Sequence, residues 1–227
     1  MRQGIAAFKC NFVQVYGLTE TTGVITALPA EDHDVVGTQR MRSCGKPTRT
    51  AEIKVIDADG NEQPVGEVGE IVVRSPQNTR GYWNLPEATA SLLRDDWLHS
   101  GDAGFFDADG YLYVYDRVKD MIISGAENIY PAEVESALYG HPAVADVAVL
   151  GVPDDQWGES VKAVVVLKPG ETATEAEIIA YCRERIAHFK APKSVDFADA
   201  LPRNPSGKLL KRVLRAPYWQ GRERQVN

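Results

Sequence analysis

Short apolar runs separated by glycine-bearing turns dominate the first half of the sequence. The alternation of apolar and polar positions predicts strands at residues 53–55, 70–74 and 111–115. An earlier apolar run at residues 12–17 predicts a further strand, whereas residues 29–50 lack periodicity and favour a long surface loop. Short strands joined by such turns are typical of a small, distorted β-barrel or sheet.

The second half alternates between strand and helix patterns. Thr174 and Glu177 are spaced as a capping box, in which each side chain accepts the backbone amide hydrogen of the other residue. The helix that they begin has Ile178, Cys182 and Ile186 on one face. We therefore expect a mixed fold of the α+β class, with a compact α+β domain of about one hundred residues at the C-terminal end. The other elements predicted there are a helix at 131–139 and strands at 121–123, 144–150, 161–167 and 195–197.

The two patterns meet in the segment 116–135, which reads DRVKDMIISGAENIYPAEVE. Ser124 and Gly125 interrupt a short apolar strand there, and Pro131 suits the first turn of a helix. A glycine turn in this position fits a backbone that must approach a ligand closely or swing. The alternative is a solvated connection between strand and helix. We expect one domain to cover residues 1–116 and a second to cover residues 117–227.

The overall charge excludes one class of partner. The chain has 227 residues, 44% of them hydrophobic and 25% charged, and a formal net charge of −7. An acidic protein of ordinary composition is not expected to bind nucleic acid. Nine basic residues against three acidic ones follow from Lys190 onward, so this end suits a phosphate-bearing small molecule or, equally, is a solvated tail.

Cysteine usage and the lack of apolar spans point to one compartment. The three cysteines, Cys10, Cys44 and Cys182, are too widely spaced for a CxxC metal pair and are expected to be reduced, buried thiols. No signal peptide and no transmembrane segment is expected from the apolar runs present. We therefore expect a cytoplasmic protein.

The run YGLTETTG at residues 16–23 combines groups that suit a nucleoside phosphate. Its glycines allow close backbone approach, and its threonine hydroxyls can donate to an anion. Glu20 offers a hard carboxylate oxygen of the kind that Mg²⁺ prefers. The alternative is a threonine-rich strand end with no ligand.

Three further positions could contribute to the same chemistry. In the run WLHSGD, Asp102 could accept hydrogen bonds from a ribose diol, although an aspartate beside a glycine more often forms an Asx turn. Arg117 could bind a ribose or a phosphate. In the run PRNPSGK, two prolines and a glycine predict a rigid loop that exposes Lys208 at its tip as a mobile positive charge, or simply as a surface lysine. This loop is not a Walker A motif, because Pro202 stands where that motif has a glycine.

Five motifs in order resemble the adenylate-forming superfamily of acyl-CoA synthetases, luciferases and peptide-synthetase adenylation domains. They are YGLTETTG, GEIVVRSPQNTRGYWNLPEAT, WLHSGD, DRVKDMIISGAENIYPAEVE and NPSGKLLK, and they cover practically the whole chain. The wording NIYPAEVE is most similar to that of fatty-acid-type CoA ligases. The resemblance implies that residues 1–116 are the end of a large AMP-binding domain with a β subdomain. It also implies that residues 117–227 are a mobile C-terminal lid.

The resemblance implies an activity in two half-reactions. A carboxylic acid attacks ATP to give acyl-adenylate and pyrophosphate, and the thiol of coenzyme A then displaces AMP. The implied ligands are ATP or AMP, Mg²⁺, coenzyme A and a small-molecule carboxylic acid. The resemblance to fatty-acid-type ligases implies that this acid is a fatty acid. By the same resemblance, Tyr16 and Gly17 belong to the nucleotide site, Thr19 contacts phosphate and Glu20 holds Mg²⁺.

The remaining roles implied by the resemblance divide between the nucleotide site and the lid. Asp102 would bind the ribose hydroxyls with help from Arg117. Lys119 matches the hinge position. Lys208 matches the lysine that bridges the substrate carboxylate and the α-phosphate during adenylation, and Gly125 matches the glycine beside the pantetheine passage.

Two departures from the family pattern affect these expectations. Ala126 stands where many relatives have a second glycine, and the phosphate loop of the TSGTTGxPKG type is not found in the 227 residues. The chain therefore resembles the last part of a synthetase and is expected to be incompetent alone, with a separate N-terminal fragment or a homo-oligomer as a possible partner. The alternative is a non-catalytic remnant that binds coenzyme A, a nucleotide or another protein. We also expect residues 1–50 to be unstable, because the strand at 13–17 would expose apolar edges.

Overall fold

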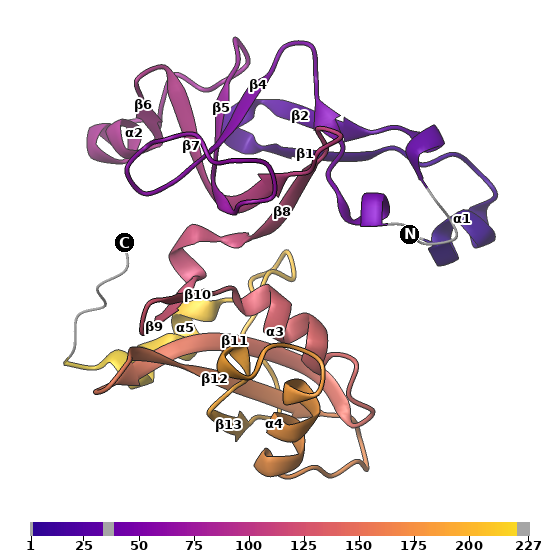
Figure 1. The fold of residues 1–227 in the computed structure, drawn as a ribbon, viewed down its shortest axis with the longest axis vertical. Coiled ribbons are helices and arrows are strands. Elements are labelled where there is room, and N and C mark those ends of the chain that lie inside the picture. The colour runs from indigo at the N-terminus through magenta and orange to yellow at the C-terminus, as the bar shows by residue number, and fades with distance from the viewer. Residues whose placement is uncertain (1, 34–38, 222–227) are drawn as a thin grey trace. The chain divides into compact units, whose positions relative to one another are not determined.

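The computed structural model describes residues 2–33 and 39–221 (Figure 1). It divides into two compact units, one ending at Val118 and the other beginning at Lys119. Helices and strands occur in both units, so the predicted α+β class is confirmed. Each unit has its own hydrophobic core and is described by itself.

Two antiparallel sheets form the first unit. Strands β1 (Gln14–Leu18), β2 (Gly23–Leu28) and β3 (Lys46–Pro47) pair in that order. The second sheet has the order β4-β5-β7-β6, with β8 also paired to β7. Its strands are β4 (Glu52–Ile56), β5 (Gly69–Arg74), β6 (Leu93–Arg94), β7 (Trp97–Phe106) and β8 (Leu112–Arg117), and the helices of the unit are α1 (Arg2–Phe8) and α2 (Pro86–Leu92).

One apolar cluster joins the two sheets of the first unit. Ile25 of β2 packs with Val55, Ile71, Val73 and Leu112 of the second sheet, and all five side chains are buried. The outward face of the first sheet has no such cover within the described residues: Val15 of β1 is 52% exposed, and Val13, just before β1, is 59% exposed. The apolar edge expected at residues 13–17 is therefore present.

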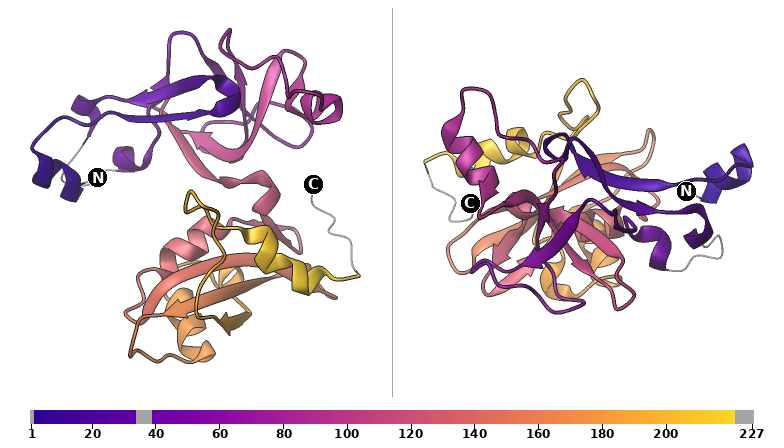
Figure 2. Two further views of the ribbon diagram at one scale, coloured as in Figure 1. Left: turned by 180° about the vertical axis from the view of Figure 1, so that it is seen from behind. Right: turned by 90° about the horizontal axis from the view of Figure 1, so that it is seen from above.

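The second unit is a five-stranded sheet covered on both faces (Figure 2). Four strands have the order β10-β9-β12-β11, and β13 pairs parallel to β12. The strands are β9 (Ile122–Ser124), β10 (Glu127–Ile129), β11 (Val144–Asp154), β12 (Gly158–Leu167) and β13 (Ser194–Phe197). The helices are α3 (Pro131–Leu138), α4 (Glu175–Arg183) and α5 (Lys211–Arg215).

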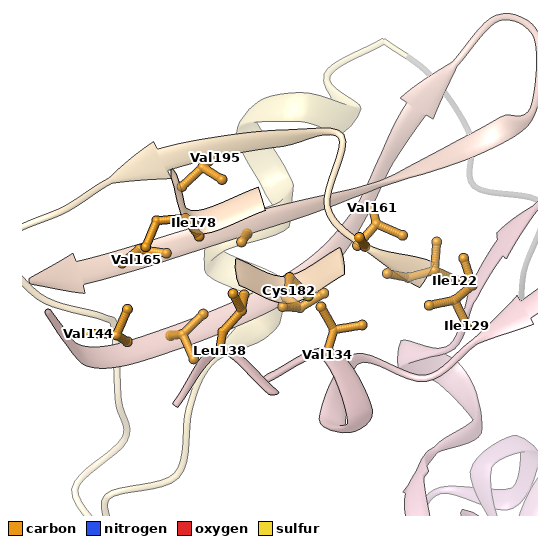
Figure 3. Close-up of a cluster of buried hydrophobic side chains, with 14 residues drawn as sticks. Ile122, Ile129, Val134, Leu138, Val144, Val161, Val165, Ile178, Cys182 and Val195 are labelled. Carbon is orange, nitrogen blue, oxygen red and sulfur yellow. The ribbon is translucent and has the colours of Figure 1, made fainter. Parts of the chain in front are cut away.

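Alternate residues of the long strands supply two cores. Val147 and Val149 of β11 belong to the cluster on the face covered by α3 and α4. Val134, Leu138 and Ile178 of the two helices are labelled members of that cluster in Figure 3. Ala148, Leu150 and Val152 point to the other face, which the C-terminal segment covers through Leu209, Leu214 and Tyr218. This period of two is the one expected of a strand buried on both faces. The predicted capping box at Thr174 is also confirmed.

Several elements differ from the sequence expectations. Strand β2 and helices α2 and α5 were not predicted, and neither was β10, which forms a hairpin with β9. The loop expected at 29–50 contains the short strand β3, and its residues 34–38 lie outside the described part of the chain. Cys182 is buried as expected, but Cys10 is exposed and Cys44 only partly buried, so the expectation of buried thiols was wrong for Cys10. Among the described helices, none is long and apolar enough to cross a bilayer.

Candidate functional site

The carboxylate of Asp102 is the centre of the first group of predicted site residues. Asp102 lies on β7 and is only 6% exposed. The hydroxyl of Tyr16, on β1, donates to its Oδ2 atom over 2.6 Å. Arg117, at the end of β8, places Nε 2.8 Å from Oδ1. Three residues that are far apart in the sequence therefore meet at one buried carboxylate, which keeps further lone pairs available for hydroxyl groups.

A bulge in β7 orients this carboxylate. Glu70 pairs with Ala103 and Val72 pairs with His99, so β7 has two more residues than β5 across this stretch. Gly101 lies in the bulge with φ of +67°, which glycine adopts without strain. The Asx turn considered for Asp102 is therefore wrong: the residue belongs to a bulged strand.

Side chains of β5 and β7 brace the bulge from within. The hydroxyl of Ser100 donates to the carbonyl of Ile71 over 2.6 Å and accepts the Asp102 amide hydrogen at 3.0 Å. The Glu70 carboxylate accepts from the Gly101 amide at 3.1 Å, and its other oxygen lies 2.9 Å from Nδ1 of His99. Sequence reasoning missed Glu70, because nothing in the spacing shows which strand lies beside the bulge.

The Tyr16 hydroxyl stays protonated and continues to donate to Asp102. Burial raises the pKa of its phenol well above the ordinary value, and the neighbouring Asp102 charge raises it further. The hydroxyl therefore stays protonated throughout the physiological range and keeps its hydrogen bond to the carboxylate.

The turn after β1 holds the other predicted residues of this unit. Position 17 has room only for glycine, because a Cβ atom there would lie 1.9 Å from the carbonyl oxygen of Gly23. Thr19 is exposed at the start of a 3₁₀ turn, Thr19–Thr21. The buried hydroxyl of Thr21 accepts from the Leu18 amide at 2.9 Å and fixes the turn.

Glu20 is held by the loop that precedes α2. The hydroxyl of Tyr82 donates to its Oε1 atom over 2.7 Å, and the Thr79 amide donates to its backbone carbonyl at 2.7 Å. The bond to Glu20 raises the pKa of Tyr82, whereas the charge of Arg117 lowers it. Arg117, which pairs with Asp102, therefore also acts electrostatically on the tyrosine that holds Glu20. Tyr82 was not predicted, although it lies in one of the five motifs.

The carboxylate of Glu20 suits a Mg²⁺ ion that is also bound by the phosphates of a substrate. Among the described residues, no group of three or more His, Cys, Asp or Glu side chains could enclose a metal ion. Mg²⁺ needs no such cage, because it is usually bound through one or two carboxylates together with substrate phosphates and water. The half-buried carboxylate of Glu20, braced by Tyr82, is suitable for that use.

The predicted residues of the second unit lie at two turns and at its first residue. Lys208 is exposed as expected, but it lies directly after the turn at residues 205–207 rather than at the tip of the hairpin, in which Arg203 and Leu209 pair. Gly125 is the turn of the β9–β10 hairpin, with φ of +67°. Lys119 lies in the 3₁₀ turn Val118–Asp120 and is exposed.

An exposed indole lies beside Gly125. The Gly125 amide donates to the Trp157 carbonyl at 2.8 Å, and a Cβ atom on the glycine would meet the indole ring at 3.0 Å. Trp157 is 45% exposed, and Nζ of Lys193 lies 5.3 Å from the centre of its ring. Trp157 was not predicted, since a lone tryptophan in a polar loop carries no signal of its neighbours.

The basic C-terminal end is partly neutralised by acidic groups of the same unit. Four of its basic residues form ion pairs of 2.7–2.9 Å, whereas Lys208 and Lys193 are exposed and Arg222 and Arg224 lie outside the described residues. The cationic surface is therefore smaller than the sequence count implied. The pairs are Lys190–Glu133, Arg203–Asp146, Lys211–Glu135 and Arg215–Asp120.

Two family models match the chain. The AMP-binding enzyme model matches residues 1–83, and the model of the AMP-binding enzyme C-terminal domain matches residues 133–208. These ranges contain residues 16–20 and Lys208 respectively.

Curated relatives match the chain at high identity. A fatty acid–[acyl-carrier-protein] ligase of Streptomyces coeruleorubidus is 44% identical over 227 residues, which is 100% of this chain and 44% of the relative. A feruloyl-CoA synthase of an Amycolatopsis species is 50% identical over 208 residues, which is 91% of this chain and 41% of the relative. The chain thus spans about two fifths of the length of these relatives.

Solved structures match in fold as well. The o-succinylbenzoate-CoA synthetase of Bacillus subtilis, in complex with its acyl-adenylate intermediate, has a TM-score of 0.83 at 40% identity and covers 94% of this chain and 43% of its own. The ATP-bound MatB of Rhodopseudomonas palustris has a TM-score of 0.84 at 39% identity, over 96% and 42%. The chain belongs to the adenylate-forming superfamily of AMP-binding enzymes, and it corresponds to the C-terminal portion of the acyl-CoA ligases in that superfamily.

Proposed function

We propose that this chain supplies the C-terminal part of the active site of an AMP-forming acyl-CoA ligase, acting on a fatty acid, ATP and coenzyme A. The observation that supports this most is the buried Asp102 carboxylate, which Tyr16 and Arg117 hold in a chain that matches the AMP-binding enzymes. A carboxylate fixed in this way can accept both hydroxyls of a ribose without reorganising.

In the first half-reaction a carboxylate oxygen of the acid attacks the α-phosphorus of ATP. The bond to the β-phosphate oxygen breaks and pyrophosphate leaves. Asp102 and Arg117 hold the ribose, Thr19 donates to a phosphate oxygen, and Lys208 bridges the acid and the α-phosphate. Glu20 would hold Mg²⁺, which would neutralise charge at the phosphates. Such transfers depend on positioning and charge more than on covalent catalysis.

In the second half-reaction the thiol sulfur of coenzyme A attacks the acyl carbon, the thiol proton is lost and AMP leaves. Gly125, which has no side chain, leaves room for the pantetheine arm. Trp157 presents an exposed ring for stacking, and Lys193 beside it presents a positive charge for a phosphate. Lys119 acts as the hinge, so that the two half-reactions use different faces of the second unit.

The acyl group and the acceptor are the finer parts of this proposal. Relatives are named for fatty acids, ferulate and 2-succinylbenzoate, and we propose a fatty acid because of the NIYPAEVE segment. A second candidate acceptor is an acyl carrier protein, because a relative that matches all of this chain is a ligase for that acceptor. Supplying coenzyme A or a phosphopantetheinylated carrier protein to the same acyl-adenylate distinguishes the two by the thioester formed.

The deciding experiment measures fatty-acid-dependent pyrophosphate release. The 227-residue polypeptide is assayed alone and then mixed with a fragment that carries the phosphate loop and the rest of the AMP-binding region of a relative. We expect little or no release alone and restored release in the mixture. Robust turnover by the polypeptide alone contradicts the expected incompetence. No turnover in the mixture, together with binding of coenzyme A or AMP by calorimetry, favours a non-catalytic binding role instead.

A further inference from the structure

Lys208 sits on a hairpin that is closed by its own backbone and by one amide side chain. The Asn204 amide donates to the Lys208 carbonyl at 2.9 Å, and the Gly207 amide donates to the Asn204 carbonyl at 2.9 Å. The side-chain oxygen of Asn204 also accepts from the Lys208 amide and from the Ser206 hydroxyl, each at 2.8 Å. These bonds set the shape of the tip, and Leu209, at the end of the hairpin, packs with the apolar cluster on the sheet.

One guanidinium forms a polar link between the hairpin and the sheet. One nitrogen of Arg203, NH1, donates to the Gly207 carbonyl at 2.8 Å, on the residue directly before Lys208. Its other nitrogen, NH2, donates to Oδ2 of Asp146 on β11 at 2.7 Å. The planar guanidinium can make two such bonds in fixed directions, which an ammonium group cannot do.

Asp146 is itself fixed on both sides. It lies at a bulge of β11, where the register shifts between Val144 and Asp146, and such bulges re-aim a side chain. Its Oδ1 atom accepts from the Tyr139 hydroxyl at 2.6 Å and from the Val147 amide at 3.0 Å. The carboxylate is only 24% exposed. Together, Tyr139, Asp146 and Arg203 form what we call the Asp146 clamp.

We propose that the Asp146 clamp positions the Lys208 hairpin, and that Asp146 and Arg203 are positioning residues for the adenylation half-reaction. The proposal rests on the role proposed above for Lys208. A single surface ion pair contributes little to stability, so a purely stabilising role would be weak. Two bonds from one guanidinium, to Asp146 on the bulged strand and to the residue before Lys208, instead fix the direction of the hairpin. An error of about 1 Å in the position of a reacting group can cost about a hundredfold in rate.

The direct test uses nitrogen-15 relaxation of the 227-residue chain. In the unaltered protein we expect order parameters near about 0.85 for the Gly207 and Lys208 amides, and values below about 0.6 in Asp146→Asn and in Arg203→Met. Arg203→Lys should resemble Arg203→Met, because a lysine cannot bridge both partners. In Asp146→Glu, the order parameters of the Gly207 and Lys208 amides should be higher than in Asp146→Asn, because a carboxylate is retained. Unchanged order parameters in Asp146→Asn overturn the proposal.

The matched control is Asp199→Asn, which removes an equal charge from an exposed position of the same unit. It should leave both order parameters unchanged, and loss of order in this variant as well would overturn the proposal. Urea unfolding is measured in parallel, to verify that each variant is folded when its relaxation is recorded. The proposal is supported only if the order parameters of the Gly207 and Lys208 amides fall in a variant that is still folded.

A functional arm uses the complemented enzyme described under the proposed function. There Asp146→Asn should slow acyl-adenylate formation about tenfold or more, whereas thioester formation from added acyl-adenylate should stay unchanged. Equal loss in both half-reactions overturns the positioning role. If complementation gives no activity with the unaltered chain, the proposed function fails, and the relaxation result still decides whether the clamp orders the hairpin.

Discussion

Asp102 illustrates how much a single residue owes to partners that are distant in the sequence. Its two oxygens are bound by Tyr16 and Arg117, which are contributed by β1 and β8. Neither partner is a sequence neighbour of Asp102. The three residues therefore come together only when β1 and β8 have been incorporated into their sheets. The stability of the first unit and the state of the site are therefore linked at this residue.

Replacing Tyr16 by phenylalanine should destabilise the first unit. The change removes the donor to Oδ2 and leaves a buried charged oxygen without that bond, which typically costs about 1–3 kcal/mol. Urea unfolding measures the loss. Tyr82→Phe is the matched control, because its hydroxyl also donates to a carboxylate but from a more exposed position. Equal effects of the two variants would contradict the importance of burial.

Asp146 should give the second unit a pH dependence. Partial burial disfavours its charged form, but the bonds from Arg203 and Tyr139 outweigh this and lower its pKa below the ordinary value of 3.8. Because the folded-state pKa is the lower one, the stabilisation is complete above the ordinary value and is lost as the pH falls through the folded-state pKa. The difference in urea midpoint between the unaltered chain and Asp146→Asn should therefore shrink from pH 6 to pH 3.

Trp157→Ala should weaken binding of coenzyme A to the chain. Loss of an aromatic stacking surface typically reduces affinity for a base by about tenfold or more. Isothermal titration calorimetry provides the measurement, and Trp83→Ala, which removes a 90% exposed indole from the first unit, is the control. Unchanged affinity in Trp157→Ala would contradict the proposed contact.

The motifs identified Tyr16, Glu20, Asp102 and Arg117 as site residues, but they gave no information on which of them touch. The pairing of Tyr16 with Asp102 depends on how β1 lies against the second sheet, and no local pattern encodes that. Glu70 and Tyr82 were missed for the same reason, since each acts through a residue far away in the chain. The catalytic roles of these residues stay predictions.

At the scale of elements, tight turns decide where strands begin and end. β6 and β7 are joined by two residues, Asp95 and Asp96, with φ of +48° and +67°. Two consecutive positive φ angles define a hairpin turn that favours glycine or asparagine. An aspartate accepts this conformation only at some cost in energy.

Asp96→Gly should stabilise the first unit for this reason. Glycine adopts a positive φ without the steric penalty of a Cβ atom, and we expect a gain of about 0.5–1 kcal/mol in the free energy of unfolding. Urea unfolding measures it. Asp59→Gly is the control, because Asp59 is an exposed turn residue that is not among those with positive φ. A gain of similar size in the control would show that the turn geometry is not the cause.

Long apolar patterns predicted that an element exists but not where it ends, since β11 ends four residues after the expected 144–150 and β12 begins three residues before the expected 161–167. β11 and β12 were predicted because their apolar runs are continuous, and α4 because its capping box is complete. α2 was missed because it has only seven residues and follows a run of turn formers. β2 was missed because the threonines and glycine before it look like the end of a strand rather than the turn between two.

At the scale of the whole molecule, the chain consists of two units with separate cores. The core of the second unit is closed on both faces of its sheet, whereas the first unit leaves Val15 of its edge strand β1 and the preceding Val13 exposed. The two units should therefore differ in resistance to local opening. The family assignment was reached from the sequence because five motifs occur in order, but the completeness of each core required the structure.

Limited trypsin digestion should reveal this difference. We expect early cleavage within residues 1–50 and near Lys119, followed by a persistent fragment that begins close to residue 120, because the second unit is packed on both faces. Mass spectrometry of the time course identifies the fragments. Disappearance of both units at the same rate would show that they unfold together.

The four ion pairs of the basic C-terminal end have a consequence for protein synthesis. Lys190 and Arg203 each pair with an acidic residue 57 positions earlier, and Arg215 pairs with one 95 positions earlier. A ribosome releases the acidic partners first, so the nascent second unit bears uncompensated negative charge until its last residues emerge. Its final packing is consequently a late event of translation, because the C-terminal segment that covers the second face of the sheet also emerges late.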